Sequence, residues 1–161
     1  MSDTPDLSAE VRLERLGFTL PEAPPPAAIY QPFMRSGDRL WIAGQIAMRD
    51  GQLMHHGVVG HEITLGEAQT CAQQCALNLL AQMKSALGDL ERIERVVKLN
   101  VFVSSAPAFI EQHLVANSAS ELMGAVFGER GKHARSAVGV SALPLGSPVE
   151  IDAVIEIKPS A

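Results

Sequence analysis

The chain has little positive charge and no cluster of basic residues. Lysine and arginine number 13 against 18 aspartates and glutamates, and the formal net charge is −5 over 161 residues. Surfaces that bind nucleic acid need clustered Lys and Arg to displace counterions. The composition therefore disfavours a nucleic-acid partner.

Long apolar runs are also missing. No stretch approaches the ~20 residues of a transmembrane helix, and residues 1–6 do not have the form of a signal peptide. We therefore expect a cytoplasmic protein with no membrane partner.

Residues that hold metals or nucleotides are scarce or wrongly spaced. Cys71 and Cys75, the two cysteines, are one helical turn apart and lack further ligands at metal-site spacing, so we expect a buried pair of reduced thiols. The five histidines show no ligand spacing, and there is neither a phosphate loop nor a dinucleotide fingerprint. The sequence predicts no metal and no cofactor.

Apolar residues, in contrast, are sufficient for the core of one domain, because they make up 47% of the chain. Residues 7–16 can form a short helix capped by Ser8, and a proline-rich stretch follows at 20–26. We expect residues 1–27 to be an N-terminal extension and residues 28–161 to be a single domain.

The spacing of apolar residues predicts an α+β domain with the order β-β-α-β-α-β-β. Helices are expected between Thr64 and Gly88 and from about Pro107 to Gly128. Strands are expected over 39–47, 52–60, 96–103, 134–142 and 149–158. If the connections are right-handed, both helices cover the same face of a mixed sheet.

Two residues of the last strands suggest a binding site. Arg135 opens a run of small and β-branched residues, and arginine matches a carboxylate bidentately. Glu150 is an acid among apolar neighbours, where it can act as a general acid or base. The alternatives are an interfacial ion pair for Arg135 and an ordinary exposed carboxylate for Glu150. If a hairpin at Gly146 joins the two strands, these residues lie about 20 Å apart. They then meet at one ligand only through long side chains, a bulge or different subunits.

The same stretch carries a resemblance to a known family. Residues 134–136 (Ala-Arg-Ser), residues 143–144 (Leu-Pro) and the strand with Glu150 resemble the end motif of the Rid family, also called the YjgF or endoribonuclease L-PSP family. Residues 43–45 (Ala-Gly-Gln) are similar to the family's Ser-Gly-Gln strand end, and residues 116–118 (Ala-Asn-Ser) to its helical Val-Asn-Ala element. The longer Gly-Lys-His-Ala-Arg-Ser-Ala-Val-Gly form of the motif resembles a divergent branch.

The resemblance implies a chorismate-mutase-like fold, a homotrimer and a ligand cleft between subunits. It also implies roles for individual residues: Arg135 holds the substrate carboxylate, and Glu150 positions or activates water, which makes these two the candidate catalytic pair. The candidate substrate-binding residues are Arg135, Tyr30, Gly44, Gln45 and Asn117.

Two departures from the family pattern concern the chemistry. Ala43 stands where the family has serine, and Ala137 stands where many members have a cysteine. We expect a Rid-like hydrolase that deaminates a small carboxylate-bearing enamine or imine. The alternative, which the lost hydroxyl and thiol favour, is a non-catalytic module that senses a small carboxylate. The endoribonuclease activity in the family's name is a third hypothesis, and the excess of acidic over basic residues disfavours it.

Overall fold

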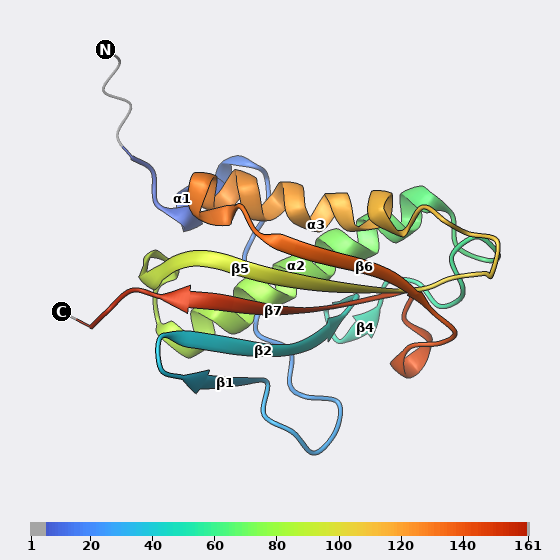
Figure 1. The fold of residues 1–161 in the computed structure, drawn as a ribbon, viewed down its shortest axis with the longest axis horizontal. Helices are drawn as coiled ribbons and strands as arrows, with labels where there is room; N and C mark the ends of the chain where they lie inside the picture. The colour runs from blue at the N-terminus through green and yellow to red at the C-terminus, as the bar shows by residue number, and fades with distance from the viewer. Residues whose placement is uncertain (1–5, 161) are drawn as a thin grey trace, which may run out of the picture.

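The computed structural model describes residues 6–160 and has one five-stranded sheet with two long helices on one side (Figure 1). Three short 3-10 turns, Leu90–Arg92, Gly128–Gly131 and Pro144–Gly146, connect some of the elements. The helices are α1 (Ala9–Arg15), α2 (Leu65–Leu87) and α3 (Gln112–Phe127). The strands are β1 (Phe33–Ser36), β2 (Arg39–Ile46), β3 (Met48–Arg49), β4 (Gln52–Leu53), β5 (Ile93–Ser104), β6 (Ala134–Val140) and β7 (Val149–Ile157).

The strands of the large sheet lie in the order β1-β2-β7-β5-β6. β5 and β6 are parallel and the other neighbours are antiparallel. The hairpin considered between the last two strands is therefore wrong, because β5 lies between them. The reason is the crossover through α3, which returns the chain beside β5 in the parallel direction and leaves the opposite edge of β5 for β7.

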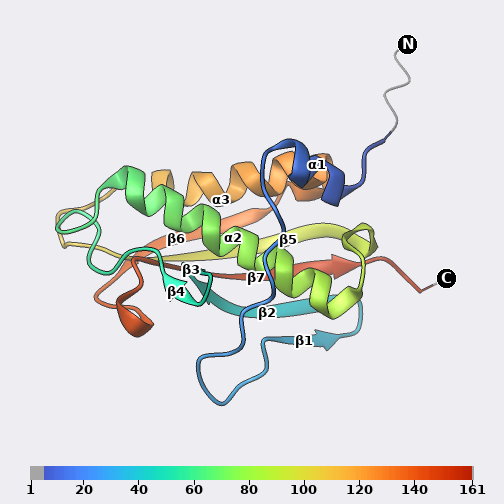
Figure 2. The same cartoon turned by 180° about the vertical axis from the view of Figure 1, so that it is seen from behind.

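The predicted covering of one sheet face is confirmed. Figures 1 and 2 show α2 and α3 side by side on the same face, which we call the helix face. Alternate residues of β7, from Val149 to Ile157, are buried against these helices, whereas the residues between them are half-buried on the other, open face. The open face is consequently where the sheet can meet another molecule.

The predicted helix ends agree with the structure at three of four places. Thr64 and Glu67 form the capping box of α2, and Gly88 ends it with a positive φ of 78°. Gly128 follows the last residue of α3. The expected start at Pro107 is wrong, because the chain turns there and α3 begins only at Gln112. A proline fits the first turn of a helix and a loop equally well, since neither needs its missing donor.

The predicted strand 52–60 is also wrong. Only Gln52–Leu53 is extended, and it pairs with Met48–Arg49 in a separate small hairpin. Asp50 and Gly51 both have positive φ angles, 53° and 78°, as a tight hairpin turn requires. The place beside β2 is taken instead by β1, which precedes it in the chain.

Candidate functional site

Arg135 lies on β6, at one edge of the sheet, and its side chain faces α3 rather than the open face. Its Nη1 donates to Asn117 Oδ1 at 3.0 Å and to Ser120 Oγ at 3.1 Å, and its Nη2 donates to the His113 carbonyl oxygen at 3.2 Å. All three acceptors are neutral. Among residues 6–160, no carboxylate lies at ion-pair distance from this guanidinium, so its charge remains available to an anion.

A short hydrogen-bond chain extends from Arg135 along α3. The ring of His133 lies 2.6 Å from the Gly131 carbonyl oxygen through Nδ1 and 2.9 Å from Ser120 Oγ through Nε2. Because a carbonyl can only accept, Nδ1 carries the proton, and in the neutral ring Nε2 accepts from the Ser120 hydroxyl. The chain fixes the orientation of the Ser120 hydroxyl beside Arg135. Our sequence analysis missed Ser120, although its position one turn after Asn117 puts both on one face of a helix.

The small residues after Arg135 share its face. Ala137 packs against the core, and a side chain at Gly139 would meet Ser105 and Gln112 at the start of α3. A thiol at position 137 would therefore lie on the helix face with Arg135. The small residues Ala137 and Gly139 thus allow α3 to approach β6.

Glu150 lies on the open face, two strands away from β6. Leu99 of β5 pairs with both Arg135 and Ala153, and Phe102 pairs with both Val138 and Glu150. Arg135 and Glu150 are thus three positions apart along the strands and on opposite faces of the sheet. One chain does not bring them to one ligand.

Burial raises the pKa of the Glu150 carboxyl above its ordinary value of 4.5, and the nearby Asp152 adds to the rise. Asp152 itself has a pKa raised by burial, which the hydrogen bond from Asn100 at 2.6 Å and the charge of Lys98 partly oppose. The Glu150 side chain lies directly over Gly44, where a Cβ atom would collide with its carboxylate. Gly44 is therefore required for the close approach of this acid to β2.

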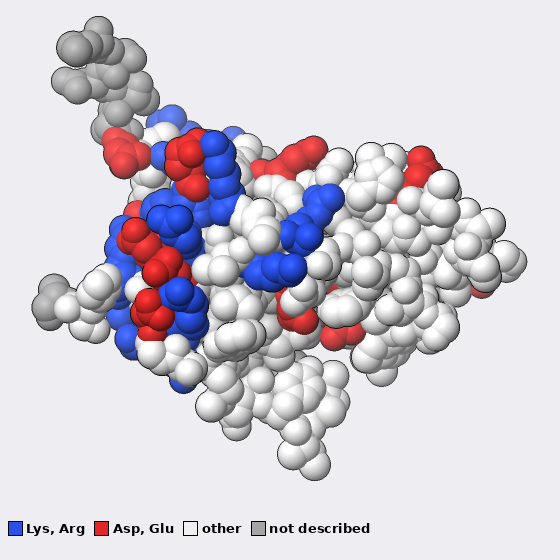
Figure 3. Space-filling view, in the orientation of Figure 1, with Lys and Arg blue, Asp and Glu red and all other residues white. Residues whose placement is uncertain are grey.

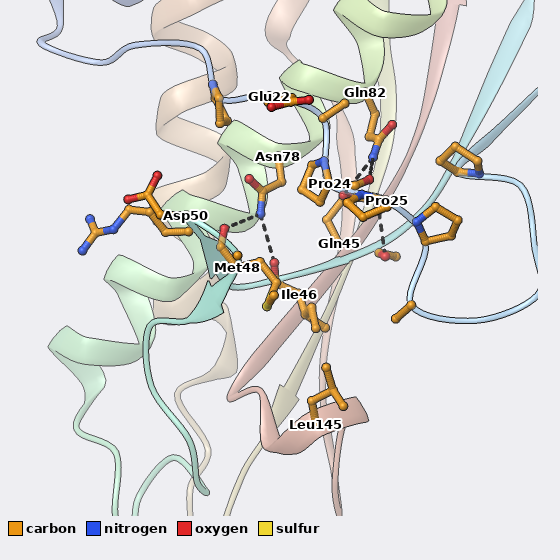
Figure 4. A pocket seen from close by; sticks show the side chains of 18 of the residues that line it. Glu22, Pro24, Pro25, Gln45, Ile46, Met48, Asp50, Asn78, Gln82 and Leu145 are labelled. Carbon is orange, nitrogen blue, oxygen red and sulfur yellow. Dashed lines mark hydrogen bonds between the residues drawn. The ribbon is translucent and has the colours of Figure 1, made fainter.

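A cavity of about 740 Å³ lies between the proline-rich segment and β2 (Figure 4). Three predicted substrate-binding residues, Tyr30, Gly44 and Gln45, line it. The register of β2 against β7 shifts between Ile42 and Gln45, and this irregularity displaces the strand next to Gly44. The cavity brings together three of the candidates, whereas Arg135, Asn117 and Glu150 do not line it.

Buried amides of α2 form the wall of this cavity. Gln82 donates to the Pro24 carbonyl oxygen at 2.7 Å, and Asn78 donates to the carbonyl oxygens of Ile46 and Met48 at 3.1 and 2.9 Å. Gln45 is buried beside Gln82, and its own amide group donates to the Ala43 carbonyl oxygen at 3.0 Å. These side chains hold the proline-rich segment and β2 against α2. The sequence signal was the polar spacing of Asn78 and Gln82, four residues apart within an apolar helix.

The described residues contain no group of three or more His, Cys, Asp or Glu side chains arranged to hold a metal ion. Cys71 and Cys75 are buried and unbridged, and burial raises the pKa of the Cys71 thiol to about 11. Neither thiol is thus a nucleophile at neutral pH. No helix between residues 6 and 160 combines the length and apolar character needed to cross a membrane.

The architecture is that of the chorismate-mutase-like α+β proteins, with a mixed sheet backed by two helices. A family model described as "YjgF/chorismate_mutase-like, putative endoribonuclease" matches residues 10–156. The chain therefore belongs to the YjgF, or Rid, family, as the motif around Arg135 implies.

The chain is similar to three proteins in particular. Protein TCP17 of Trypanosoma cruzi is 50% identical over 147 residues, which cover 91% of this chain and 92% of that protein. A crystallised Agrobacterium tumefaciens protein of unknown function is 52% identical, with a TM-score of 0.88 over 93% of this chain and 92% of its own. A protein of Dermatophagoides farinae named 2-iminobutanoate/2-iminopropanoate deaminase is 28% identical over 141 residues, which cover 88% of this chain and 95% of that protein.

Proposed function

We propose that the protein is a hydrolase that deaminates small imines or enamines bearing a carboxylate. The observation that carries the proposal is the Arg135 guanidinium, which neutral groups of α3 hold in place and which no carboxylate among residues 6–160 neutralises. A guanidinium that is held in position and has no carboxylate partner can form charge-assisted hydrogen bonds with a ligand carboxylate. The relative named for the deamination of two 2-imino acids, both of them carboxylates, supports the same substrate class.

Hydrolysis of an imine adds water to the C=N carbon and then expels ammonia, which leaves a carbonyl group. An enamine enters this path after a proton is added to its carbon. Arg135 would hold the carboxylate, and Glu150 would take a proton from the attacking water. The raised pKa of Glu150 makes it a stronger base than an ordinary glutamate, which favours proton transfer near neutral pH.

In this proposal the two halves of the site come from two copies of the chain. The first half, Arg135 with Asn117, lies at the β6 edge, and the second, Glu150 over Gly44, lies on β7 and β2 toward the opposite edge. When complementary patches occupy different surfaces of one chain, copies join head to tail, and such contacts form a ring if the rotation between copies closes. We propose the homotrimer that the family resemblance implies, with three clefts between subunits.

The open face of the sheet fits such an interface. Met34, Trp41 and Val138 are 59%, 54% and 46% exposed, and Met34 and Trp41 are paired residues of β1 and β2. Figure 3 shows this face, and the area below and to the right of its middle is largely free of charged side chains. Exposed apolar side chains gathered on one face are typical of a surface that another chain covers.

The direct test is the rate of ammonia release from imines generated freshly from amino acids. Wild-type protein should accelerate hydrolysis above the spontaneous rate. Glu150→Gln should lose about 10²–10⁴-fold of that acceleration because it removes a general base. Arg135→Ala should lose roughly 10- to 150-fold, the worth of a charge-assisted hydrogen bond. Arg35→Ala, on β1 at the other edge of the sheet, is the control for loss of one positive charge.

Absence of acceleration by wild-type protein on every carboxylated imine would overturn the proposed activity. If carboxylates still bound, and Arg135→Ala abolished that binding, the non-catalytic sensing function would replace it. Ala43 and Ala137 favour this second candidate, because they remove a hydroxyl and a thiol from the family's pattern. A ribonuclease is disfavoured by the net charge of −5. Tight, salt-sensitive RNA binding with cleavage would reverse that judgement.

A further inference from the structure

A shallow hollow of about 390 Å³ lies beside Arg135 on the helix face. It is lined by Ser120, Gly124, Gly131, Lys132, His133 and Arg135. Asn117, Ser120 and Gly124 follow one another along α3 at spacings of three and four, so they share one side of that helix. The hollow is therefore a continuation of the place where Arg135 would hold a carboxylate, and it extends toward the C-terminal end of α3.

Gly124 keeps this hollow open. A glycine inside a helix costs about 0.8–1 kcal/mol relative to alanine, and here a Cβ atom would meet nothing within 4 Å. Packing thus gives no reason for glycine at this position. Gly131 differs, because a Cβ atom there would collide with the Met123 carbonyl oxygen. Gly131 thus allows its segment to approach α3 closely, whereas Gly124 leaves the hollow unfilled.

The lining of the hollow is positive in a chain whose net charge is negative. Arg135 and Lys132 supply the positive charge, and no lining residue is acidic. Lys132 pairs with Glu129 at 2.8 Å, but their side chains are 73% and 85% exposed, and such pairs contribute little. The Lys132 ammonium group is therefore free to turn to a ligand.

We propose that this hollow binds a second anionic group of the same ligand, so that the site takes dicarboxylic imino acids. The proposal rests on the proposed function, since it needs Arg135 to hold the first carboxylate. Lys132 and Arg135 both line the hollow and are three residues apart, at most about 11 Å along the chain, so their long side chains can reach the two ends of a five-carbon dicarboxylate. Ser120 accepts from Arg135 and lies against His133, so its hydroxyl group keeps both side chains directed to the hollow.

The test compares two stable 2-oxo acids, the products that deamination of the matching imino acids would give, by calorimetry at low ionic strength. 2-Oxoglutarate carries two carboxylates, and 2-oxobutanoate carries one. Wild-type protein should bind 2-oxoglutarate at least about tenfold more tightly, since a hydrogen-bonded charge contributes about 1.5–3 kcal/mol. Lys132→Ala should remove this preference and leave the affinity for 2-oxobutanoate unchanged. Arg35→Ala, which changes the net charge equally, should keep the preference.

Variants of Gly124 provide a second, independent test. Gly124→Leu should fill the hollow and remove the preference for 2-oxoglutarate while raising the melting temperature, because it improves helix propensity. A loss of affinity with a gain of stability cannot come from unfolding. Gly124→Ala is the smaller matched change, with a similar gain in stability and a smaller loss of preference.

Each result decides between the two proposals. If Arg135→Ala abolishes binding of both ligands while Lys132→Ala and Gly124→Leu keep the wild-type preference, or if wild-type protein has none, the second anion site is wrong and the proposed function stands. If neither ligand binds wild-type protein, carboxylate recognition fails and this inference fails with it.

Discussion

At the scale of single residues, the environment of Glu150 is the least ordinary. Its carboxyl is half-buried over Gly44, two residues from Asp152 on the same face of β7. Burial raises its pKa in the folded protein, whereas the unfolded chain restores the ordinary value of 4.5. Above the folded-state pKa, the charged Glu150 therefore lowers the free energy of unfolding. This destabilisation decreases as the pH falls and disappears below 4.5, where the carboxyl is protonated in both states.

We therefore predict that Glu150→Gln stabilises the fold at pH 7. The gain should shrink as the pH falls toward 4.5 and vanish below it, because both side chains are then neutral. Thermal unfolding of wild type and variant across this range checks the prediction. Glu121→Gln, at an exposed carboxylate of α3, is the matched control for the same chemical change on the surface. A variant less stable than wild type at pH 7 would mean that the charged carboxylate is favourably paired.

At the scale of elements, α2 holds the proline-rich segment as well as the core. Gln82 is 2% exposed and donates to the Pro24 carbonyl oxygen at 2.7 Å, and it lies 3.4 Å from Gln45 Oε1 through the same nitrogen. Proline has no N–H group to anchor a segment, so a side-chain donor to a carbonyl is one of the few ways to fix this stretch. The cavity lined by Tyr30 and Gly44 depends on that anchor.

Gln82→Leu should release the segment while leaving α2 helical. The lost donor leaves two acceptors unsatisfied, so we expect a loss of about 1–3 kcal/mol of folding free energy. Cleavage by a glutamate-specific protease after Glu22 should become several-fold faster than in wild type. Gln73→Leu, a half-exposed position of the same helix, is the matched control. Equal cleavage rates in all three proteins would show that other contacts hold the segment.

At the scale of the whole molecule, the open face of the sheet is the surface with the most to explain. Two helices cover one face, and the exposed Trp41 and Met34 lie on the other. Leaving such side chains in water is costly, at roughly 25 cal/mol per Å² of apolar area. The proposed site, divided between two copies, would place a second copy of the chain on this face.

Light scattering should accordingly give a mass of three times the 17.2 kDa chain at micromolar concentration. Trp41→Asp should shift this mass toward the monomer, because it puts an unpaired charge in the interface. Val11→Asp is the control, since Val11 is an exposed apolar residue of α1, which packs by α3 on the helix face. A monomeric wild-type protein would exclude both the trimer and the shared cleft.

The sequence by itself determined the elements whose signals are local. The capping box of Thr64 and Glu67, the left-handed Gly88 and the apolar stripe of α2 identified that helix, and alternation identified β5 and β7. The motif residues near Arg135 predicted the family that the match over residues 10–156 shows. These features depend on neighbours within about one turn or a few strand residues.

Only the tertiary structure decided which strands are neighbours and which face each candidate residue occupies. β1 is short, the hairpin of β3 and β4 stands apart, and β5 separates β6 from β7, none of which local periodicity encodes. The face of Arg135 follows from the packing of α3 on β6, and the approach of Glu150 to Gly44 follows from the shift in register of β2. Such contacts join residues far apart in the chain, so they exist only once the core has fixed the topology.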